Sequence, residues 1–119
     1  MSSKERPIRV LSASVDHLLN HSRALFLRRC GFEVTTSSSK EHAREQLDAA
    51  TYDVLIFGTT LSRDACLELA EFFRKRNSRG KIIEVVPSEA PMPKNQPDAI
   101  VASADEPAKL VTTIYAQVT

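Results

Sequence analysis

Residues 54–57 form an uninterrupted apolar run, Val-Leu-Ile-Phe, between Asp53 and Gly58. A continuous apolar run of this length predicts a β-strand that is covered on both faces, as the strands of parallel sheets are. In parallel α/β sheets, ligands bind and chemistry takes place at the carboxyl ends of the strands. This strand ends at Gly58, which has no side chain to offer to a ligand or a substrate.

Strand-like and helix-like segments alternate along the rest of the chain. The predicted strands are residues 8–13, 32–36, 54–57, 81–86 and 98–103. The predicted helices begin at Ser14 or Asp16, after the capping pattern of residues 38–41, at Asp64 and at Pro107. This alternation predicts an α/β fold with a five-stranded parallel sheet and right-handed crossovers. The size favours the doubly wound, flavodoxin-like strand order 2-1-3-4-5.

Apolar residues recur at helical spacing in each predicted helix and predict its inward face. In the first helix this face consists of Leu18, Leu19, Ser22, Leu25 and Phe26. In the second it consists of Ala43, Leu47 and Ala50, and in the third of Cys66, Leu69, Ala70 and Phe73. In the last helix it consists of Leu110, Val111, Ile114, Tyr115 and Val118.

The connection between the fourth and fifth strands contains four prolines, at positions 87, 91, 93 and 97. A regular helix cannot run through prolines at this density, because each one removes a backbone donor and clashes with the preceding turn. We therefore expect the helix between these two strands to be missing or vestigial.

The chain has 119 residues, which fits one domain, predicted here as residues 8–119 after a flexible tail at residues 1–7. Its 16 basic and 15 acidic residues give a net charge of +1, so bulk charge indicates neither nucleic acid nor an acidic membrane as a partner. No apolar run approaches the length of a membrane span, and the N-terminal residues lack the pattern of a signal peptide. We expect a cytoplasmic protein in which Cys30 and Cys66 are reduced.

Two segments carry a resemblance to a known family. The first reads Leu27-x-x-x-Gly31-Phe32-Glu33-Val34, and the second reads Tyr52-Asp53-Val54-Leu55-Ile56. Together with the strand at 8–13, the helix at 43–50 and Leu67-Glu68-Leu69, they resemble the receiver domain of bacterial two-component response regulators. The resemblance covers about residues 8–118.

Receiver domains accept a phosphoryl group on an aspartate at the end of the third strand. The resemblance places Gly58 at that position. It places Ser14 and Val15 at the acidic pair that holds Mg²⁺, Val86 at the Thr or Ser position, and Ser103 at the Lys position. Gly58 cannot form an aspartyl phosphate, and Ser14 and Val15 supply no carboxylate for Mg²⁺. The resemblance therefore implies a degenerate pseudo-receiver that is not an enzyme and uses no cofactor or metal.

Four residues near this position could still form a residual pocket: Asp16, Thr59, Thr60 and Ser62. Asp16 is favoured as the N-cap of the first helix, and the other three are favoured as turn residues. With Ser14, Gly58 and Ser103 they could instead bind a small ligand or an anion at the strand ends.

The leading hypothesis is an atypical receiver-like domain in bacterial signal transduction that acts as a protein-interaction module. It predicts a protein partner in a signalling pathway, with a homodimer as a further option. Receiver domains often communicate through the face around their fourth helix, so the resemblance makes Pro91, Met92, Pro93 and Tyr115 candidate contacts. The alternative is a small-ligand or anion sensor, and a third option is phosphotransfer at a nonstandard residue.

Three other features have both a simple and a functional interpretation. His17 and His21 are spaced to share one helix face, where solvent contact is favoured over metal binding. Cys66 is favoured as a core residue over a nucleophile. The basic residues 74–76 and Arg79 are favoured as a solvated helix end over a binding site for an acidic partner or nucleic acid.

Overall fold

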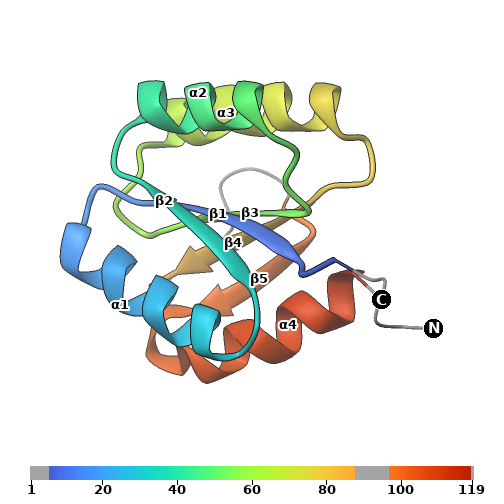
Figure 1. Cartoon of the computed structure of the whole chain (residues 1–119). Coiled ribbons are helices and arrows are strands. Elements are labelled where there is room, and N and C mark those ends of the chain that lie inside the picture. The colour runs from blue at the N-terminus through green and yellow to red at the C-terminus, as the bar shows by residue number, and fades with distance from the viewer. Residues whose placement is uncertain (1–5, 88–96, 119) are drawn as a thin grey trace.

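The computed structural model describes residues 6–87 and 97–118, and Figure 1 shows the arrangement of their helices and strands. The strands are β1 (Arg9–Ala13), β2 (Glu33–Ser37), β3 (Val54–Phe57), β4 (Lys81–Val86) and β5 (Ala99–Ala102). The helices are α1 (His17–Arg29), α2 (Lys40–Ala49), α3 (Arg63–Arg76) and α4 (Ala108–Val118). A short 3₁₀ turn, η2 (Ser103–Asp105), follows β5.

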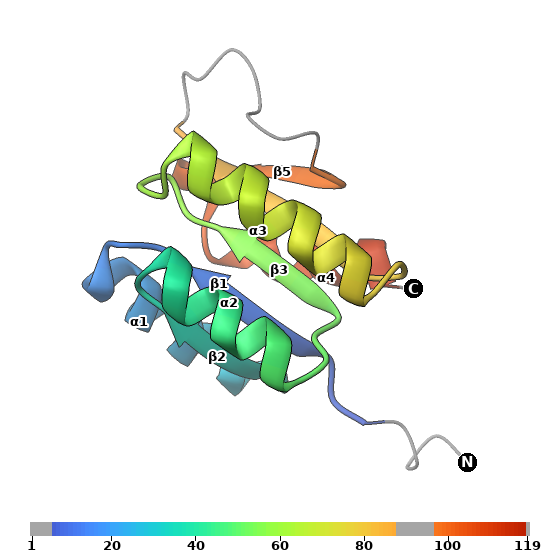
Figure 2. The same ribbon diagram turned by 90° about the horizontal axis from the view of Figure 1, so that it is seen from above.

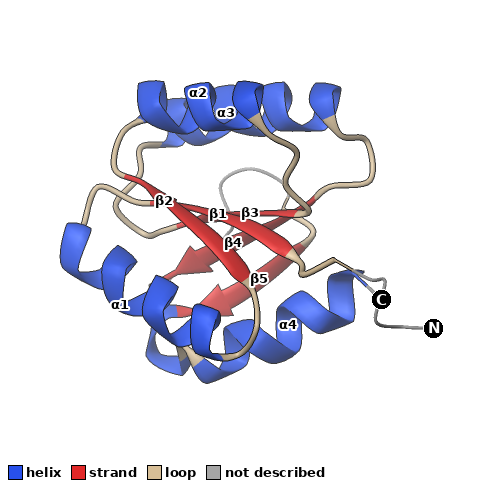
Figure 3. Cartoon of the chain, viewed as in Figure 1, coloured by secondary structure: helices blue, strands red, loops and turns tan. Residues whose placement is uncertain are grey.

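All five strands are parallel, and their spatial order is β2-β1-β3-β4-β5. This is the predicted flavodoxin-like order, which is therefore confirmed. Figure 3 shows the three layers: α2 and α3 cover one face of the sheet, and α1 and α4 cover the other. Seen from above in Figure 2, α2 and α3 run side by side, in agreement with the contacts between them.

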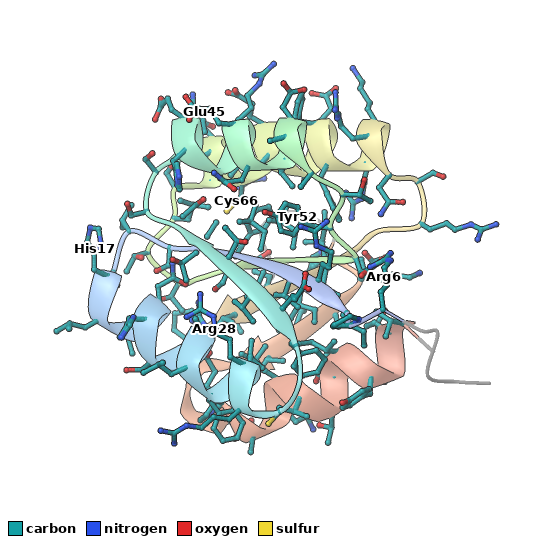
Figure 4. All side chains as sticks on the ribbon, viewed as in Figure 1. Arg6, His17, Arg28, Glu45, Tyr52 and Cys66 are labelled. Atoms are coloured by element: carbon teal, nitrogen blue, oxygen red, sulfur yellow. The ribbon has the colours of Figure 1, made fainter. Side chains whose placement is uncertain are left out.

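The core is divided by the sheet into two apolar clusters. Leu11, Leu55, Phe57 and Ile82 face α2 and α3, whereas neighbouring residues of the same strands face α1 and α4. Residues 54–57 are completely buried on both faces, as the unbroken apolar run predicts. Figure 4 shows Cys66 and Tyr52 between the α2–α3 layer and the sheet, whereas Glu45 points away from the sheet. Cys66 is thus a buried core residue, as favoured from the sequence.

Short polar side chains fix where three of the helices begin. Asp16, Ser39 and Ser62 are the N-caps of α1, α2 and α3, and each accepts a hydrogen bond from a backbone N–H of the first turn. The residue after the C-cap of α1 is Gly31, whose φ of 100° lies in the left-handed region that glycine adopts without strain. These caps set the helix bounds within a residue or two of the predicted ones.

The predicted inward face of α1 is wrong except at Phe26, which is partly buried against the core. The residues that α1 buries are Asn20, Arg23, Ala24 and Leu27. Leu18 is 81% exposed, and Leu19 and Leu25 also lie at the surface. Apolar spacing alone favoured Leu18, Leu19 and Leu25 for the core. The inward face instead carries Asn20 and Arg23, which are stabilised by hydrogen bonds to the sheet and by an ion pair between Arg23 and Glu106. The inward faces predicted for α2 and α3 are confirmed, except that Ala50 is only partly buried.

The last helix buries Leu110 and Ile114, while Tyr115 is 44% exposed and its ring lies 5.2 Å from that of Phe32. Residues 88–96, with the candidate contacts Pro91, Met92 and Pro93, lie outside the described residues, so the missing crossover helix remains a prediction. Within residues 6–87 and 97–118, no helix has the length and apolar character needed to cross a membrane.

Candidate functional site

The carboxyl ends of β1 and β3 meet at one edge of the sheet. Ala13 is paired with Phe57, so the residues that follow them, Ser14 and Gly58, are neighbours. The Gly58 N–H donates to the carbonyl oxygen of Ala13 at 2.9 Å, and the Ser14 N–H donates to that of Ser37 at 3.0 Å. This edge is where the sequence predicts the functional position.

Ser14 occupies the space that a side chain at residue 58 would need. A Cβ atom built on Gly58 would lie 2.8 Å from both Cβ and Oγ of Ser14, closer than real Cβ contacts. The Ser14 side chain is buried, and its Oγ lies 3.1 Å from Oγ1 of Thr60 and accepts a hydrogen bond from the Asp16 N–H. A side chain at residue 58 would therefore force Ser14 or the backbone to shift, because the space beside Gly58 is filled by the Ser14 side chain.

Two of the predicted pocket residues serve as helix caps. Oδ1 of Asp16 accepts from the Leu19 N–H at 3.0 Å, which confirms the capping interpretation. Oγ of Ser62 accepts from the Ala65 N–H at 3.2 Å. Val15 is exposed, and Val86 lies half-buried at the end of β4. Thr60 lies at the surface, where it contacts Ser14.

A cavity of about 200 Å³ lies beside the Ser14–Gly58 contact. Its lining comprises Ser14, Leu19, Ser22, Arg23, Thr59, Ser103, Glu106 and Pro107. Three of the predicted site residues, Ser14, Thr59 and Ser103, are thus brought together from the segments that follow β1, β3 and β5. The cavity presents several hydroxyl groups together with one ion pair.

That ion pair, Arg23–Glu106, was not found by sequence reasoning. Arg23 is only 4% exposed, and its Nε and Nη2 donate to Oε1 and Oε2 of Glu106 at 2.6 and 3.0 Å. A buried guanidinium needs a partner of this kind, because an unpaired buried charge is strongly destabilising. The pair joins α1 to the segment between β5 and α4, and it neutralises the positive charge at the cavity wall.

A polar network continues from Arg23 to the sheet. Nη1 of Arg23 donates to Oγ of Ser12 at 3.0 Å, and that Oγ donates to Oδ1 of Asn20 at 2.6 Å. Nδ2 of Asn20 donates to the carbonyl oxygens of Ser12 and Ser37. One sequence signal could have indicated this network: Ser12 interrupts an apolar strand, and a buried hydroxyl needs a hydrogen-bonding partner.

Histidines surround a second hollow of about 500 Å³ between α1 and the β2–α2 connection. Its lining includes Leu18 and all three histidines of the chain, His17, His21 and His42. Within the part of the chain that the structure describes, no group of three or more His, Cys, Asp or Glu side chains is placed to hold a metal ion.

Asp53 lies at the opposite edge of the sheet, at the amino end of β3. Its carboxylate accepts two hydrogen bonds from Arg6, at 2.8 and 2.9 Å, and one from the backbone N–H of Arg9. Burial raises the pKa of the Asp53 carboxyl, but the hydrogen bonds from Arg6 and Arg9 outweigh this effect, so its pKa is lowered. Arg6, which the sequence assigned to a flexible tail, is thus tied to the domain, and residues 1–5 lie outside the described residues.

No family model and no curated protein matches the sequence. Solved structures do match. A response regulator receiver protein from Sinorhizobium medicae superposes with a TM-score of 0.81 at 21% identity, over 94% of each chain. The chemotaxis response regulator CheY4 of Vibrio cholerae gives 0.81 at 17% identity, over 93% of this chain and 98% of the other. This is the fold of response regulator receiver domains.

A third similar receiver, the response regulator TrrA of Thermotoga maritima, was solved in complex with Mg²⁺ and BeF (TM-score 0.78, 19% identity, 92% of this chain and 98% of the other). The ends of β1 and β3 in this chain do not fit such a cation. Mg²⁺ is held by carboxylate oxygens, whereas Ser14, Val15 and Gly58 have none. The nearby carboxylate of Asp16 caps α1. The chain thus shares the receiver architecture.

Proposed function

We propose that this receiver-fold domain is a signalling module that binds a protein partner and accepts no phosphoryl group at the ends of β1 and β3. The carrying observation is the contact between Ser14 and Gly58, where a Cβ on residue 58 would lie 2.8 Å from Ser14. An acyl phosphate requires a carboxylate nucleophile, and this position has neither a carboxylate nor room for one. As part of this proposal, the domain is non-enzymatic and works in the cytoplasm.

The partner in this proposal is another protein of a signalling pathway. One structural relative, TrrA, has also been solved in complex with the histidine kinase ThkA. A receiver-fold domain that has lost the acceptor retains surfaces on which such proteins could dock. The intact receiver fold and the filled ends of β1 and β3 together support protein binding, and not a chemical reaction, as the activity of this domain.

Thermal unfolding with Mg²⁺ and beryllofluoride tests the proposal. Beryllofluoride with Mg²⁺ requires an acceptor carboxylate, so we expect the unfolding temperature of this protein to stay unchanged. A receiver domain that has the acceptor aspartate serves as the positive control and should be stabilised by mass action. A comparable stabilisation of the present protein would overturn the proposal.

A second candidate function is a small-ligand or anion sensor, which the cavity of about 200 Å³ favours. Because Glu106 already neutralises Arg23, the cavity favours a small, uncharged polar molecule that meets the hydroxyls of Ser14, Thr59 and Ser103. A ligand that binds there would raise the unfolding temperature of the wild type but not of Ser103→Trp, which replaces a lining hydroxyl with a bulky ring. A metabolite screen with no shift in the wild type would exclude this candidate.

A further inference from the structure

The hollow of about 500 Å³ between α1 and the β2–α2 connection holds side chains that the proposed function does not use. It shares no lining residue with the cavity of about 200 Å³ beside Ser14 and Gly58. All three histidines of the chain line it, and His17 and His21 lie exposed one turn apart on α1. Figure 4 shows His17 at the beginning of this helix. Imidazole groups from two separate helices thus converge on one hollow.

Four polar side chains at this hollow have no partner within the described protein. The side chains of His17, His21, Thr36 and Ser38 make no hydrogen bond and no ion pair with any other residue of 6–87 and 97–118. Thr36 lies near the end of β2, and Ser38 lies in the turn that follows it. Two imidazoles and two hydroxyls therefore remain available to a ligand in the hollow.

The third imidazole, that of His42, is held in place by its neighbours. Its Nδ1 lies 3.0 Å from Oγ of Ser37, and its Nε2 lies 3.3 Å from Nε2 of Gln46. These contacts fix the orientation of the ring at the wall of the hollow. His42 is thus a reporter for a ligand bound there, whereas His17 and His21 supply the unused nitrogen atoms.

The charges around the hollow favour an anion. No Asp or Glu side chain belongs to its lining, and β2 contributes only hydroxyl-bearing side chains. The carboxylate of Asp16 caps α1, and Lys40 at the beginning of α2 is paired with Glu68. Glu41 and Glu45 lie exposed on α2, and Figure 4 shows Glu45 pointing away from the sheet. Since an imidazole gains a positive charge just below neutral pH, this lining becomes cationic on mild acidification.

A metal ion is a less suitable ligand for the same hollow. Within the described residues, the three imidazoles are not placed to hold one metal ion together. A structural zinc site takes four N, S or O ligands, and two imidazoles by themselves fall short of that number. The donor groups that remain are N–H and O–H groups, which suit the oxygen atoms of an anion.

We infer that this hollow binds the phosphate group of a small soluble molecule, with His17 and His21 as cationic donors and Thr36 and Ser38 as hydroxyl donors. Protonated imidazoles donate charge-assisted hydrogen bonds to phosphate oxygens. The volume of the hollow is in the range of small-ligand sites, and Leu18 gives it an apolar wall for the rest of the molecule. The inference goes beyond the proposed function, because this site is separate from the ends of β1 and β3.

The imidazole signals in ¹H–¹³C NMR spectra test the site, because every histidine of the chain lines the hollow. With inorganic phosphate at pH 6 and constant ionic strength, we expect saturable shifts of the His17 and His21 signals. His17→Gln combined with His21→Gln keeps two polar side chains but removes both ionisable rings. It should weaken phosphate binding roughly tenfold or more, as followed by the His42 signal. Shifts that do not saturate in the wild type, or an unchanged affinity in the double variant, would overturn the inference.

Sulfate measures the contribution of imidazole charge, because it stays doubly negative between pH 6 and pH 8. We expect sulfate to bind the wild type roughly tenfold more weakly at pH 8 than at pH 6, since the imidazoles are then neutral. Equal affinity at the two pH values would show that the histidines do not hold the anion, and the inference would fail.

Arg29→Gln is the matched control, because it removes a positive charge from the exposed last turn of α1, outside the hollow. It should leave phosphate binding unchanged, and circular dichroism melting should show that every variant is folded. A loss as large as that of the double histidine variant would mean that general surface charge attracts the anion, which contradicts the inference.

Adenosine monophosphate distinguishes the two sources of the phosphate group. Tighter binding than that of inorganic phosphate would identify a phosphomonoester as the ligand, and equal binding would identify phosphate itself. Either result supports the site, provided that His17→Gln with His21→Gln weakens it. Adenosine monophosphate binding that the double variant retains in full would place the nucleotide elsewhere and overturn the inference.

Discussion

Helices α1 and α3 lie on opposite faces of the same sheet and differ in how polar their buried faces are. Helix α3 buries Cys66, Leu69 and Phe73 and leaves its charges in solvent, which is the usual arrangement. Helix α1 buries Asn20 and Arg23 beside Ala24 and Leu27, and it leaves Leu18, Leu19 and Leu25 at the surface. The difference shows that apolar spacing along a helix does not by itself identify the face that packs on the sheet.

Truncating one side chain on each helix should give the largest difference in the free energy of unfolding between α1 and α3. Phe73→Ala removes a fully buried ring from the inward face of α3, and we expect a loss of about 3–5 kcal/mol in the free energy of unfolding. Leu18→Ala on α1 should change it by no more than about 0.5 kcal/mol, because Leu18 is exposed. Urea unfolding measures both values. Similar losses would mean that Leu18 packs in the core and that the comparison is mistaken.

Removing the buried guanidinium of Arg23 on α1 should have the second-largest effect on the free energy of unfolding. Arg23→Met leaves the carboxylate of Glu106 without its partner, and we expect a loss of about 3 kcal/mol. Arg23→Met together with Glu106→Leu should recover more than half of this, because a pair of apolar residues replaces a buried ion pair at little cost. A double variant as unstable as the single one would show that Arg23 stabilises α1 through other contacts.

Adding a side chain at Gly58, at the end of β3, should have a smaller effect on the free energy of unfolding. Gly58→Ala places a methyl group against Cβ of Ser14, so the backbone must shift, and overpacking of this kind costs about 2 kcal/mol. Adding Ser14→Gly removes the colliding atoms and should restore most of the stability. If Gly58→Ala is neutral by itself, Ser14 does not close this position.

The amino edge of the sheet should show the smallest effect, and it depends on pH. Asp53→Asn weakens the hydrogen bonds from Arg6 and Arg9 and should cost about 1 kcal/mol at pH 7. Because the pKa of Asp53 is lowered by folding, its contribution is complete above the unfolded pKa of about 3.9 and is lost as the pH falls through the folded pKa.

Unfolding of the wild type and of Asp53→Asn at a series of pH values measures this contribution. The difference between them should be constant from about pH 5 upward and should shrink as the solution becomes more acidic. Arg6→Ala is the control and should remove part of the same pH dependence. A difference that grows on acidification would contradict the assigned direction of the pKa shift.

The fold could be predicted almost completely from the sequence, because its signals are local. The apolar run at residues 54–57, the capping residues Asp16 and Ser39, and Gly31 after α1 each specify structure within a few residues. Five strands separated by helical segments then leave few parallel topologies open. The strand order followed from those constraints.

The site could be predicted only in part, because its decisive contacts join distant residues. The sequence predicts that Gly58 offers no chemistry, but not that Ser14 fills its space from the end of another strand. It also could not pair Arg23 with Glu106, which lies 83 residues away in the chain. Without that pair, the leucines of α1 were the better candidates for burial. The error on α1 and the missed ion pair therefore have the same cause.

Intact-mass measurement after incubation with acetyl phosphate and Mg²⁺ tests the central claim most directly, namely that the strand ends around Ser14 and Gly58 are chemically silent. The account predicts a mass identical to that of the untreated protein, while a receiver domain with its acceptor aspartate gains one phosphoryl group in the same experiment. A gain of one phosphoryl group by this protein would contradict the account.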